Sequence, residues 1–196
     1  PQPFKEQEKP VPVPVECTGR PYTFKERKFT ASELEYWQQY GITPEILEQY
    51  KVCSVVQFQS ENAEGNPFSY TSTKEEPIYG YKSKRFIKLY RPFSRTRFLY
   101  GGNIGENYCF GLEQLPSKGD TLFITGGEKD VLSLAAKGFH AICFNSETVT
   151  VPPNIIYKLT FRFKHIILLY DMDATGTESA KKHEKQLCEY LSLIHI

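Results

Sequence analysis

The sequence predicts an α/β protein in which a parallel sheet is flanked by helices and preceded by a small α+β subdomain. Three short apolar segments, at 121–125, 140–144 and 165–170, alternate with helical patterns, which is typical of a parallel sheet covered on both faces. Upstream, β-forming segments separated by turn residues between 52 and 100 indicate a meander. The chain has 196 residues, 40% of them hydrophobic, which suffices for one ordinary domain or two small ones.

We expect the chain to divide into four parts. Residues 1–28 hold five prolines within the first fourteen positions and predict an extended linker. Residues 29–118 are expected to form the α+β subdomain, and 119–190 the parallel sheet with its helices. Residues 191–196 resemble the translation of a common sequencing-adapter end, so we expect a non-native tail on a truncated fragment whose sheet lacks a further strand.

Local signals mark the ends of the elements in the first subdomain. Thr30 and Glu33 have the spacing of a capping box, and the helix that they begin is expected to stop at Gly41. Thr43 followed by Pro44 predicts a second short helix, whose acidic character favours a packing role over a DNA-reading helix-turn-helix. The meander strands are expected at 52–58, 78–81, 85–90 and 97–100.

Glycine and proline pairs mark the ends of the helices predicted in the second half of the chain. The glycine pair at 126–127 leads from the first apolar strand into a helix that ends at Gly138. The proline pair at 152–153 begins a second helix, which we expect to reach Phe163. The last helix is expected over 174–190, after the third strand.

Composition narrows the class of protein. The net charge is +1, and no apolar run approaches the length that a membrane-spanning helix needs, so we expect no membrane partner. The five cysteines are far apart and lack Cys-x-x-Cys spacing, which argues against a zinc ribbon. Scattered cysteines in odd number favour reduced thiols and therefore a cytoplasmic protein.

The positive charge is concentrated in one segment. Residues 81–97 carry seven basic side chains and no acidic one, which leaves a net −6 on the rest of a chain whose total is +1. Aromatic residues, among them Phe86 and Tyr90, interleave with these bases. Cations beside stacking rings are what single-stranded nucleic acid needs, although a solvated strand pair with an aromatic core face has the same pattern.

Acidic residues follow two of the predicted parallel strands. Glu128 and Asp130 come after the first strand, and Asp171 and Asp173 come directly after the third. Ligand sites in such sheets lie at the carboxyl ends of the strands, and residues two apart on an extended chain point to one side. A set of oxygen ligands suits Mg²⁺ or Mn²⁺, whereas the alternative is that these aspartates only cap the following helix.

Two motifs together resemble a TOPRIM domain, in particular that of bacterial and phage primase-helicases. The first is Thr-Gly-Gly-Glu-Lys-Asp-Val-Leu-Ser-Leu (125–134), and the second is Leu-Leu-Tyr-Asp-Met-Asp-Ala-Thr-Gly (168–176). This resemblance covers about 119–190. The helices and basic meander of 29–110 resemble the amino-terminal half of a primase RNA-polymerase domain. Among TOPRIM proteins, the sequence resembles the primase-like ones of Bacteroidetes genomes and their mobile elements.

The resemblance implies roles for individual residues. Asp171 and Asp173 match the family's Asp-x-Asp and would bind Mg²⁺ or Mn²⁺, and Asp130 matches the aspartate of the first motif and would help to hold the metal. The family's first glutamate is replaced by Gly126. Glu128, two residues later, is the candidate catalytic carboxylate that could substitute for it.

The resemblance also implies an activity and partners. We expect a DNA primase-like nucleotidyltransferase that acts on a single-stranded DNA template with nucleoside triphosphates, and a replicative helicase in cis or in trans. The basic residues that would grip these substrates are assigned as a group: Lys82, Lys84, Arg85, Lys88 and Arg91. Two alternatives stay open, a catalytically degenerate TOPRIM module that only binds nucleic acid and a TOPRIM nuclease that uses the same acids with water.

Overall fold

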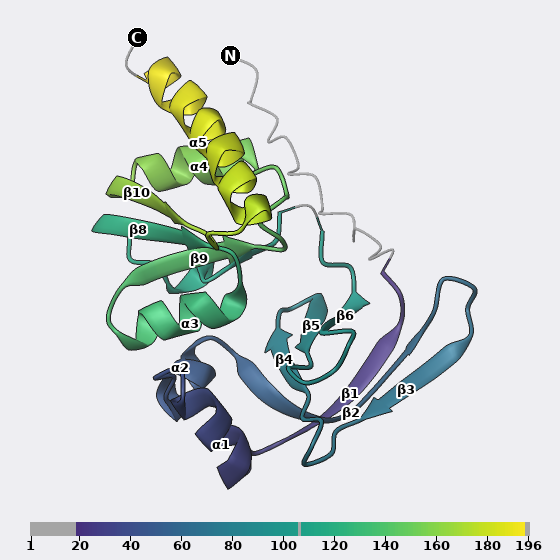
Figure 1. The fold of residues 1–196 in the computed structure, drawn as a ribbon. Helices are drawn as coiled ribbons and strands as arrows, with labels where there is room; N and C mark the ends of the chain where they lie inside the picture. Colours follow the sequence, from purple (N-terminus) through teal and green to yellow (C-terminus); the bar gives the residue numbers. More distant parts are fainter. Residues whose placement is uncertain (1–18, 106, 195–196) are drawn as a thin grey trace, which may run out of the picture.

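The computed structural model describes residues 19–105 and 107–194, and their strands form two sheets (Figure 1). The first sheet is antiparallel, with the order β1-β2-β4-β5-β6 and with β3 paired to β2. Its strands are β1 (Tyr22–Arg27), β2 (Val52–Glu61), β3 (Pro67–Thr71), β4 (Tyr79–Lys82), β5 (Phe86–Tyr90) and β6 (Phe98–Gly102).

Strand β1 corrects the prediction of a linker over 1–28. It pairs with β2 along its whole length, and Phe24 lies opposite Phe58 in the register. The apolar side chains of Tyr22 and Phe24 pack on the buried face of this sheet, which gives the segment a place in the core. The proline-rich stretch itself, at 1–18, lies outside the described residues.

The two helices α1 (Ala31–Gln38) and α2 (Pro44–Gln49) begin where the sequence predicted. The capping box is confirmed, because the Thr30 hydroxyl accepts from the main-chain N–H of Glu33 and the Glu33 carboxylate accepts from that of Thr30. The Glu33 side chain is buried. Its carboxylate also accepts hydrogen bonds from Arg27 and Ser54, at 3.1 and 2.8 Å, which satisfy its oxygens there.

The second sheet has the order β10-β8-β9-β7. Strands β8 (Gly119–Thr125), β9 (His140–Phe144) and β10 (Phe163–Leu169) are parallel, which confirms the predicted sheet, and the short β7 (Cys109–Phe110) is antiparallel to β9. Strand β7 precedes residue 119, so the second sheet recruits a strand from the segment that the sequence assigned to the first subdomain. The 3₁₀ turn Leu112–Gln114 connects β7 to β8.

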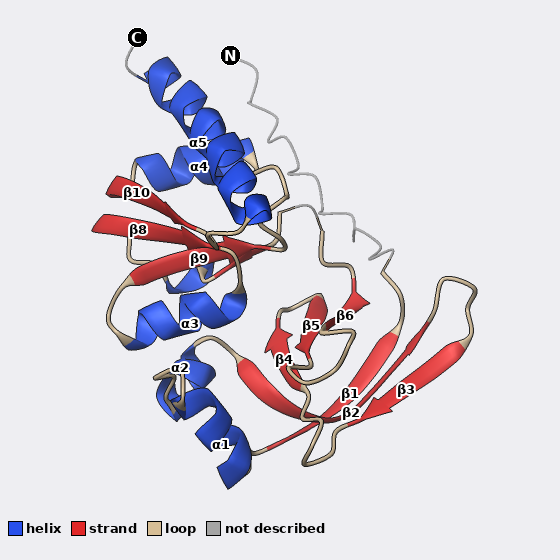
Figure 2. Ribbon diagram, in the orientation of Figure 1, coloured by secondary structure: helices blue, strands red, loops and turns tan. Residues whose placement is uncertain are grey.

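Helices cover the parallel sheet on both faces (Figure 2). Helix α3 (Glu128–Ala136) packs with the α1–α2 pair on one face, and α4 (Pro153–Thr160) and α5 (Ala174–Ile194) cover the other. Helix α4 ends at Thr160, before the predicted Phe163, and β10 begins at Phe163. Between them the Arg162 guanidinium donates to the carbonyl oxygens of Leu115 and Pro116. Residues 191–194 continue α5, and 195–196 lie outside the described residues.

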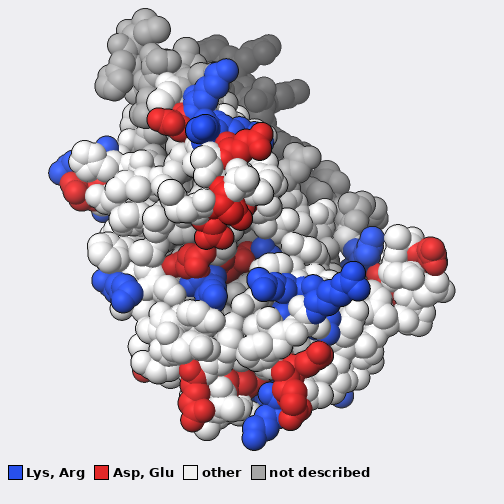
Figure 3. Space-filling model, in the orientation of Figure 1, with Lys and Arg blue, Asp and Glu red and all other residues white. Residues whose placement is uncertain are grey.

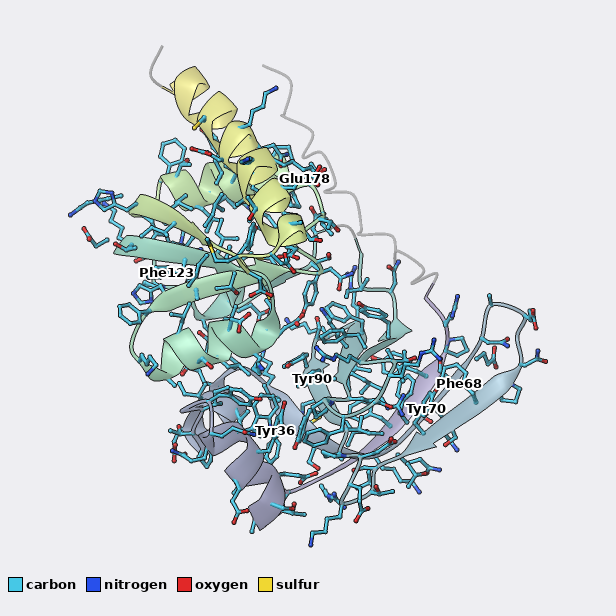
Figure 4. The ribbon with its side chains drawn as sticks, viewed as in Figure 1. Tyr36, Phe68, Tyr70, Tyr90, Phe123 and Glu178 are labelled. Carbon is cyan, nitrogen blue, oxygen red and sulfur yellow. The ribbon has the colours of Figure 1, made fainter. Side chains whose placement is uncertain are left out.

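One hydrophobic cluster joins the two parts of the molecule. Trp37 and Leu47 from the helical pair share it with Val131 and Leu132 of α3, and all four are buried. Tyr36 on α1 points toward Tyr90 on β5, and their hydroxyls lie 2.9 Å apart (Figure 4). Within the described part of the chain, no helix is long and apolar enough to cross a membrane.

Candidate functional site

A buried ion pair joins the two sheets beneath the ends of the parallel strands. Lys88 on β5 places its Nζ 2.6 Å from Oε1 of Glu128, the first residue of α3, and the two side chains are 3% and 2% exposed. The ammonium also donates to the carbonyl oxygen of Asn145 at 3.2 Å, and Tyr108 donates its hydroxyl to Glu128 Oε1 at 2.7 Å. These additional hydrogen bonds help to offset the desolvation cost of the buried charges.

Aromatic rings enclose this pair. The Lys88 Nζ lies 4.7 Å from the ring centroid of Phe98 and 5.4 Å from that of Tyr108. Burial, and then the charge of Glu128, raises the pKa of the Tyr108 hydroxyl well above its ordinary value, so this hydroxyl stays protonated and donates. The predicted catalytic carboxylate of Glu128 therefore faces Lys88 rather than solvent.

Asp171 and Asp173 are exposed and follow directly after β10. Asp173 Oδ1 accepts the main-chain N–H of Gly176 at 2.7 Å, so it caps α5 with one of its two oxygens, as the capping alternative expected. A Cβ at Gly176 would overlap the carbonyl oxygen of Asp171. This glycine therefore lets the chain after β10 pack against the first turn of α5, which sets the position of Asp171.

Asp130, in the first turn of α3, lies within electrostatic reach of the Asp-x-Asp segment. The Asp130 side chain is exposed, but desolvation by the groups around its carboxyl contributes most to raising its pKa, Lys129 opposes the rise, and the charges of Asp171 and Glu128 add to it. Asp130 follows β8 and Asp171 follows β10, and these two strands are parallel neighbours in the sheet.

The structure adds an acid that the sequence reasoning missed. Glu147 lies in the β9–α4 loop, and its Oε2 would be 3.4 Å from a Cβ built on Gly126. Burial raises the pKa of Glu147, and the charges of Asp173 and Asp171 raise it further. Glu147 also follows a parallel strand, which is a signal present in the sequence, but it lies three residues beyond the end of β9 and outside both motifs.

Acidic and basic side chains lie near one another on one face of the molecule. Figure 3 shows Asp and Glu side chains near the ends of the parallel strands and the start of α5, facing Lys and Arg side chains over β4–β6. In the described residues, no three His, Cys, Asp or Glu side chains converge closely enough to hold a metal ion. Chemically, the exposed basic side chains on this face suit a phosphate.

The five predicted basic residues do not form one exposed group. Lys84 and Arg85 are exposed in the β4–β5 turn. Lys82 pairs with Glu26 at 2.7 Å between Nζ and Oε2. Lys88 and Arg91 are buried, and the Arg91 guanidinium lies 4.3 Å from the ring centroid of Tyr70, one of the labelled rings in Figure 4. The alternating pattern of β5 could not show that a second sheet covers the Lys88 side.

The two-sheet arrangement is the fold of primase catalytic cores. A "DnaG catalytic core" structure matches with a TM-score of 0.58 and 17% identity, covering 78% of this chain and 58% of that one. The "E. coli primase catalytic core" matches at 0.56 and 16%, covering 78% and 59%. The primase fragment of the bacteriophage T7 primase-helicase matches at 0.50 and 17%, covering 92% and 66%.

At 16–17% sequence identity, the structural similarity to the two primase cores shows the fold alone. The chain spans about three fifths of the length of those cores. No family model matches the sequence, and no curated protein matches it.

Proposed function

We propose that this chain is part of a TOPRIM-type DNA primase, a nucleotidyltransferase that makes RNA primers on single-stranded DNA. The observation that carries the proposal is the primase-core fold, in which Asp130 follows β8 and Asp171 and Asp173 follow the neighbouring parallel strand β10. Acids two residues apart after a parallel strand are in the place where such sheets bind ligands.

Mg²⁺ or Mn²⁺ is the cofactor that this donor set would hold. The two glycines after β8 leave space that carboxylates border, because a Cβ at Gly126 would lie 3.4 Å from Glu147 Oε2 and one at Gly127 would lie 3.7 Å from Asp130 Oδ2. Oxygen donors without sulfur or imidazole favour hard divalent cations over zinc. Asp171, Asp173 and Asp130 would hold the cation, which when bound supplies positive charge to the phosphates.

The remaining chemistry belongs to the chain's own side chains. Lys84 and Arg85, exposed in the β4–β5 turn, would bind the triphosphate or the template backbone. In the reaction a primer 3′-hydroxyl attacks the α-phosphate in line, the new phosphodiester bond forms, the bond to the β-phosphate breaks, and pyrophosphate leaves. Positioning and electrostatic stabilisation would supply most of the rate enhancement.

We predict that Asp171→Asn abolishes Mg²⁺-dependent primer synthesis while the fold is retained, because Asp171 is exposed and the change removes only a charge. The measurement is extension of labelled ribonucleotides on single-stranded DNA, with circular dichroism as the check on folding. Asp120→Asn is the matched control, since Asp120 is an exposed acid paired with Lys164 at the beginning of β8. A fully active Asp171→Asn protein would contradict the proposed site.

The same assay separates the other candidate functions. Cut strands instead of primers would indicate a TOPRIM nuclease, and Mg²⁺-independent binding without product would indicate a degenerate binding module, which Gly126 favours. The T7 fragment that this chain resembles comes from a primase-helicase, so we propose a replicative helicase as partner, in cis or in trans. A primase in this role would work in the cytoplasm.

A further inference from the structure

We propose that a polar cleft beside α1, lined by Tyr36, Tyr79 and Phe93, binds a base of single-stranded nucleic acid. The exposed ring of Phe93 would stack on the base, and Arg95 and Arg97 of the same β5–β6 turn would contact the neighbouring phosphates. Helix α1 lies at the end of the molecule away from α4 and α5 (Figure 1). The inference goes beyond the proposed function, because it assigns a strand-binding site outside both sequence motifs that needs no divalent cation.

Three segments that are far apart in the sequence form the walls of this cleft, whose volume is about 640 Å³. Helix α1 supplies Tyr36 and Gln39, the β3–β4 loop supplies Ser72 and Lys74, and the β5–β6 turn supplies Phe93. Cavities of this size are typical of sites for small ligands, a nucleotide among them.

Side-chain contacts hold the three walls together. The Tyr36 hydroxyl on α1 lies 2.9 Å from that of Tyr90, the last residue of β5. The guanidinium of Arg91, which begins the β5–β6 turn, lies 3.5 Å from a carboxylate oxygen of Glu76 in the β3–β4 loop. The main-chain N–H of Arg91 donates to the carbonyl oxygen of Arg97 at 2.7 Å, which closes the turn.

Buried polar atoms without a partner lie at this cleft. The Tyr79 side chain is 0% exposed, and within the described residues its hydroxyl has no hydrogen-bond partner. The Ser72 hydroxyl is likewise buried and unpaired there, and both residues line the cleft. An unpaired buried hydroxyl is costly unless a ligand completes its hydrogen bonds, so these two groups point to an occupant.

The charges that act on the Tyr79 hydroxyl indicate that it is directed toward the cleft. Burial contributes most to raising its pKa, Glu33 and Tyr90 raise it further, and Arg27 opposes the rise. Glu33 and Arg27 both line the cleft. The hydroxyl therefore stays protonated and can donate to a ligand there.

The β5–β6 turn supplies a stacking ring and cations. Phe93 is 62% exposed, and its ring meets that of Tyr36 edge to face, with the centroids 5.7 Å apart. This contact orients the ring while leaving most of its surface open to a ligand. Arg95 and Arg97, in the same turn, are exposed. An exposed ring beside cations is the arrangement that binds unstacked bases and their phosphates.

The acids that line the cleft favour a neutral group inside it. Glu33 already accepts hydrogen bonds from Arg27 and Ser54. Glu35 is exposed and would repel a phosphate. A base carries no charge, and its amino groups donate to carboxylate and hydroxyl oxygens. The base therefore belongs in the cleft, and the phosphates belong at the turn, beside its exposed arginines.

The test measures binding of a labelled single-stranded oligonucleotide of mixed sequence to the whole chain by fluorescence anisotropy, in EDTA so that no divalent cation contributes. We expect Phe93→Ala to weaken binding about fivefold or more, and Phe93→Trp to retain it. Phe139→Ala is the matched control, because Phe139 is 49% exposed and meets the ring of Phe123 edge to face at 5.6 Å. Arg95→Gln should reduce the slope of log affinity against log salt by about one.

Tyr79→Phe separates a ligand contact from a structural role. Since the Tyr79 hydroxyl has no partner within the described residues, its removal should not lower the free energy of unfolding. The same change should weaken oligonucleotide binding about two- to tenfold.

Each outcome decides a different claim. If Phe93→Ala weakens binding no more than Phe139→Ala does, or if Tyr79→Phe leaves binding unchanged, the cleft does not hold a base and the inference is refuted. If adenosine, cytidine, guanosine or uridine monophosphate binds the cleft as tightly as the oligonucleotide, its ligand is a free nucleotide and the strand is refuted. Because no divalent cation is present, none of these results depends on primer synthesis, so the cleft can fail while the proposed function stands, and the reverse.

Discussion

At the scale of single residues, Lys88 shows how one side chain can belong to a basic segment and still not be a surface charge. It lies in a run of seven bases, yet its ammonium is enclosed by Glu128, Asn145 and the rings of Phe98 and Tyr108. Removing one member of a buried pair leaves the other without its partner, which costs far more than the pair contributes net.

We predict that Lys88→Met lowers the free energy of unfolding by about 3–5 kcal/mol, because the Glu128 carboxylate stays buried without its counter-ion. Urea unfolding followed by circular dichroism measures this loss. The double variant Lys88→Met with Glu128→Met should lose less than the sum of the two single changes. Lys82→Met, which breaks a more exposed pair with Glu26, should cost less than about 1 kcal/mol, and an equal cost for both lysines would contradict the prediction.

His183 predicts a pH dependence of stability. Its Nε2 lies 2.6 Å from the Val149 carbonyl oxygen, to which it donates, and its Nδ1 lies 2.6 Å from the Tyr170 hydroxyl, which donates to it when the ring is neutral. Burial lowers the pKa of His183 below the ordinary 6.5, the Val149 hydrogen bond opposes this, and Lys182 adds to it. The unfolded chain therefore binds a proton at a higher pH than the folded one does.

We expect the His183 contribution to stability to be complete above pH 6.5 and to fall as the pH drops from there toward the lowered folded-state pKa. The measurement is the free energy of unfolding across this range, compared between the unmodified chain and His183→Gln. The difference between the two slopes isolates His183 from His140 and His165. Identical slopes would show that the ring does not titrate differently on folding.

At the scale of elements, helices and parallel strands were easier to predict than the strands of the first sheet. Capping signals and apolar runs act within a few residues, and they placed α1, α2, α3 and the parallel strands. Strands β1 and β3 were missed: β1 pairs with β2, which begins twenty-five residues after β1 ends, and β3 is a short strand that begins with a proline and follows β2 through the turn at 62–66. A strand of that kind is stabilised by its neighbour more than by its own sequence.

Strand β10 is the element that we expect to cause self-association. Among the described strands it pairs on one side only, with β8, and Ile167 and Leu169 on its outer face are 42% and 48% exposed. An exposed apolar edge strand pairs readily with another chain. Sedimentation velocity should show concentration-dependent association, which Ile167→Lys reduces and Tyr157→Lys, at an exposed position on α4, does not. Equal effects of both changes would point to general hydrophobic contact instead.

At the scale of the whole molecule, the two sheets share a core and should unfold together. Trp37, the sole tryptophan, is fully buried in the cluster that also contains Leu132 of α3. We predict that Trp37 fluorescence and far-ultraviolet circular dichroism give the same unfolding midpoint. Leu132→Ala should lower the stability seen by both probes, by about 2–5 kcal/mol. Two separate transitions would show that the parts fold independently.

The joining of the sheets also explains why part of the candidate site could not be predicted. The acids of the Asp-x-Asp segment were found from the sequence because topology alone puts them at a strand end. The partner of Glu128 and the neighbour of Gly126 could not be found from the sequence. Lys88 lies forty residues before Glu128, and Glu147 follows a different strand from Gly126. Such pairs depend on how the β9–α4 loop meets the first sheet.

The sequence by itself determined the elements of the second half, their parallel arrangement and the acids at two strand ends, because periodicity, caps and glycines act over a few residues. The tertiary structure alone decided that Lys88 is buried, that Glu128 faces it, and that Glu147 lies beside Gly126. These facts follow from packing between segments far apart in the chain, where burial and charge neutralisation select the partner and no local pattern records it.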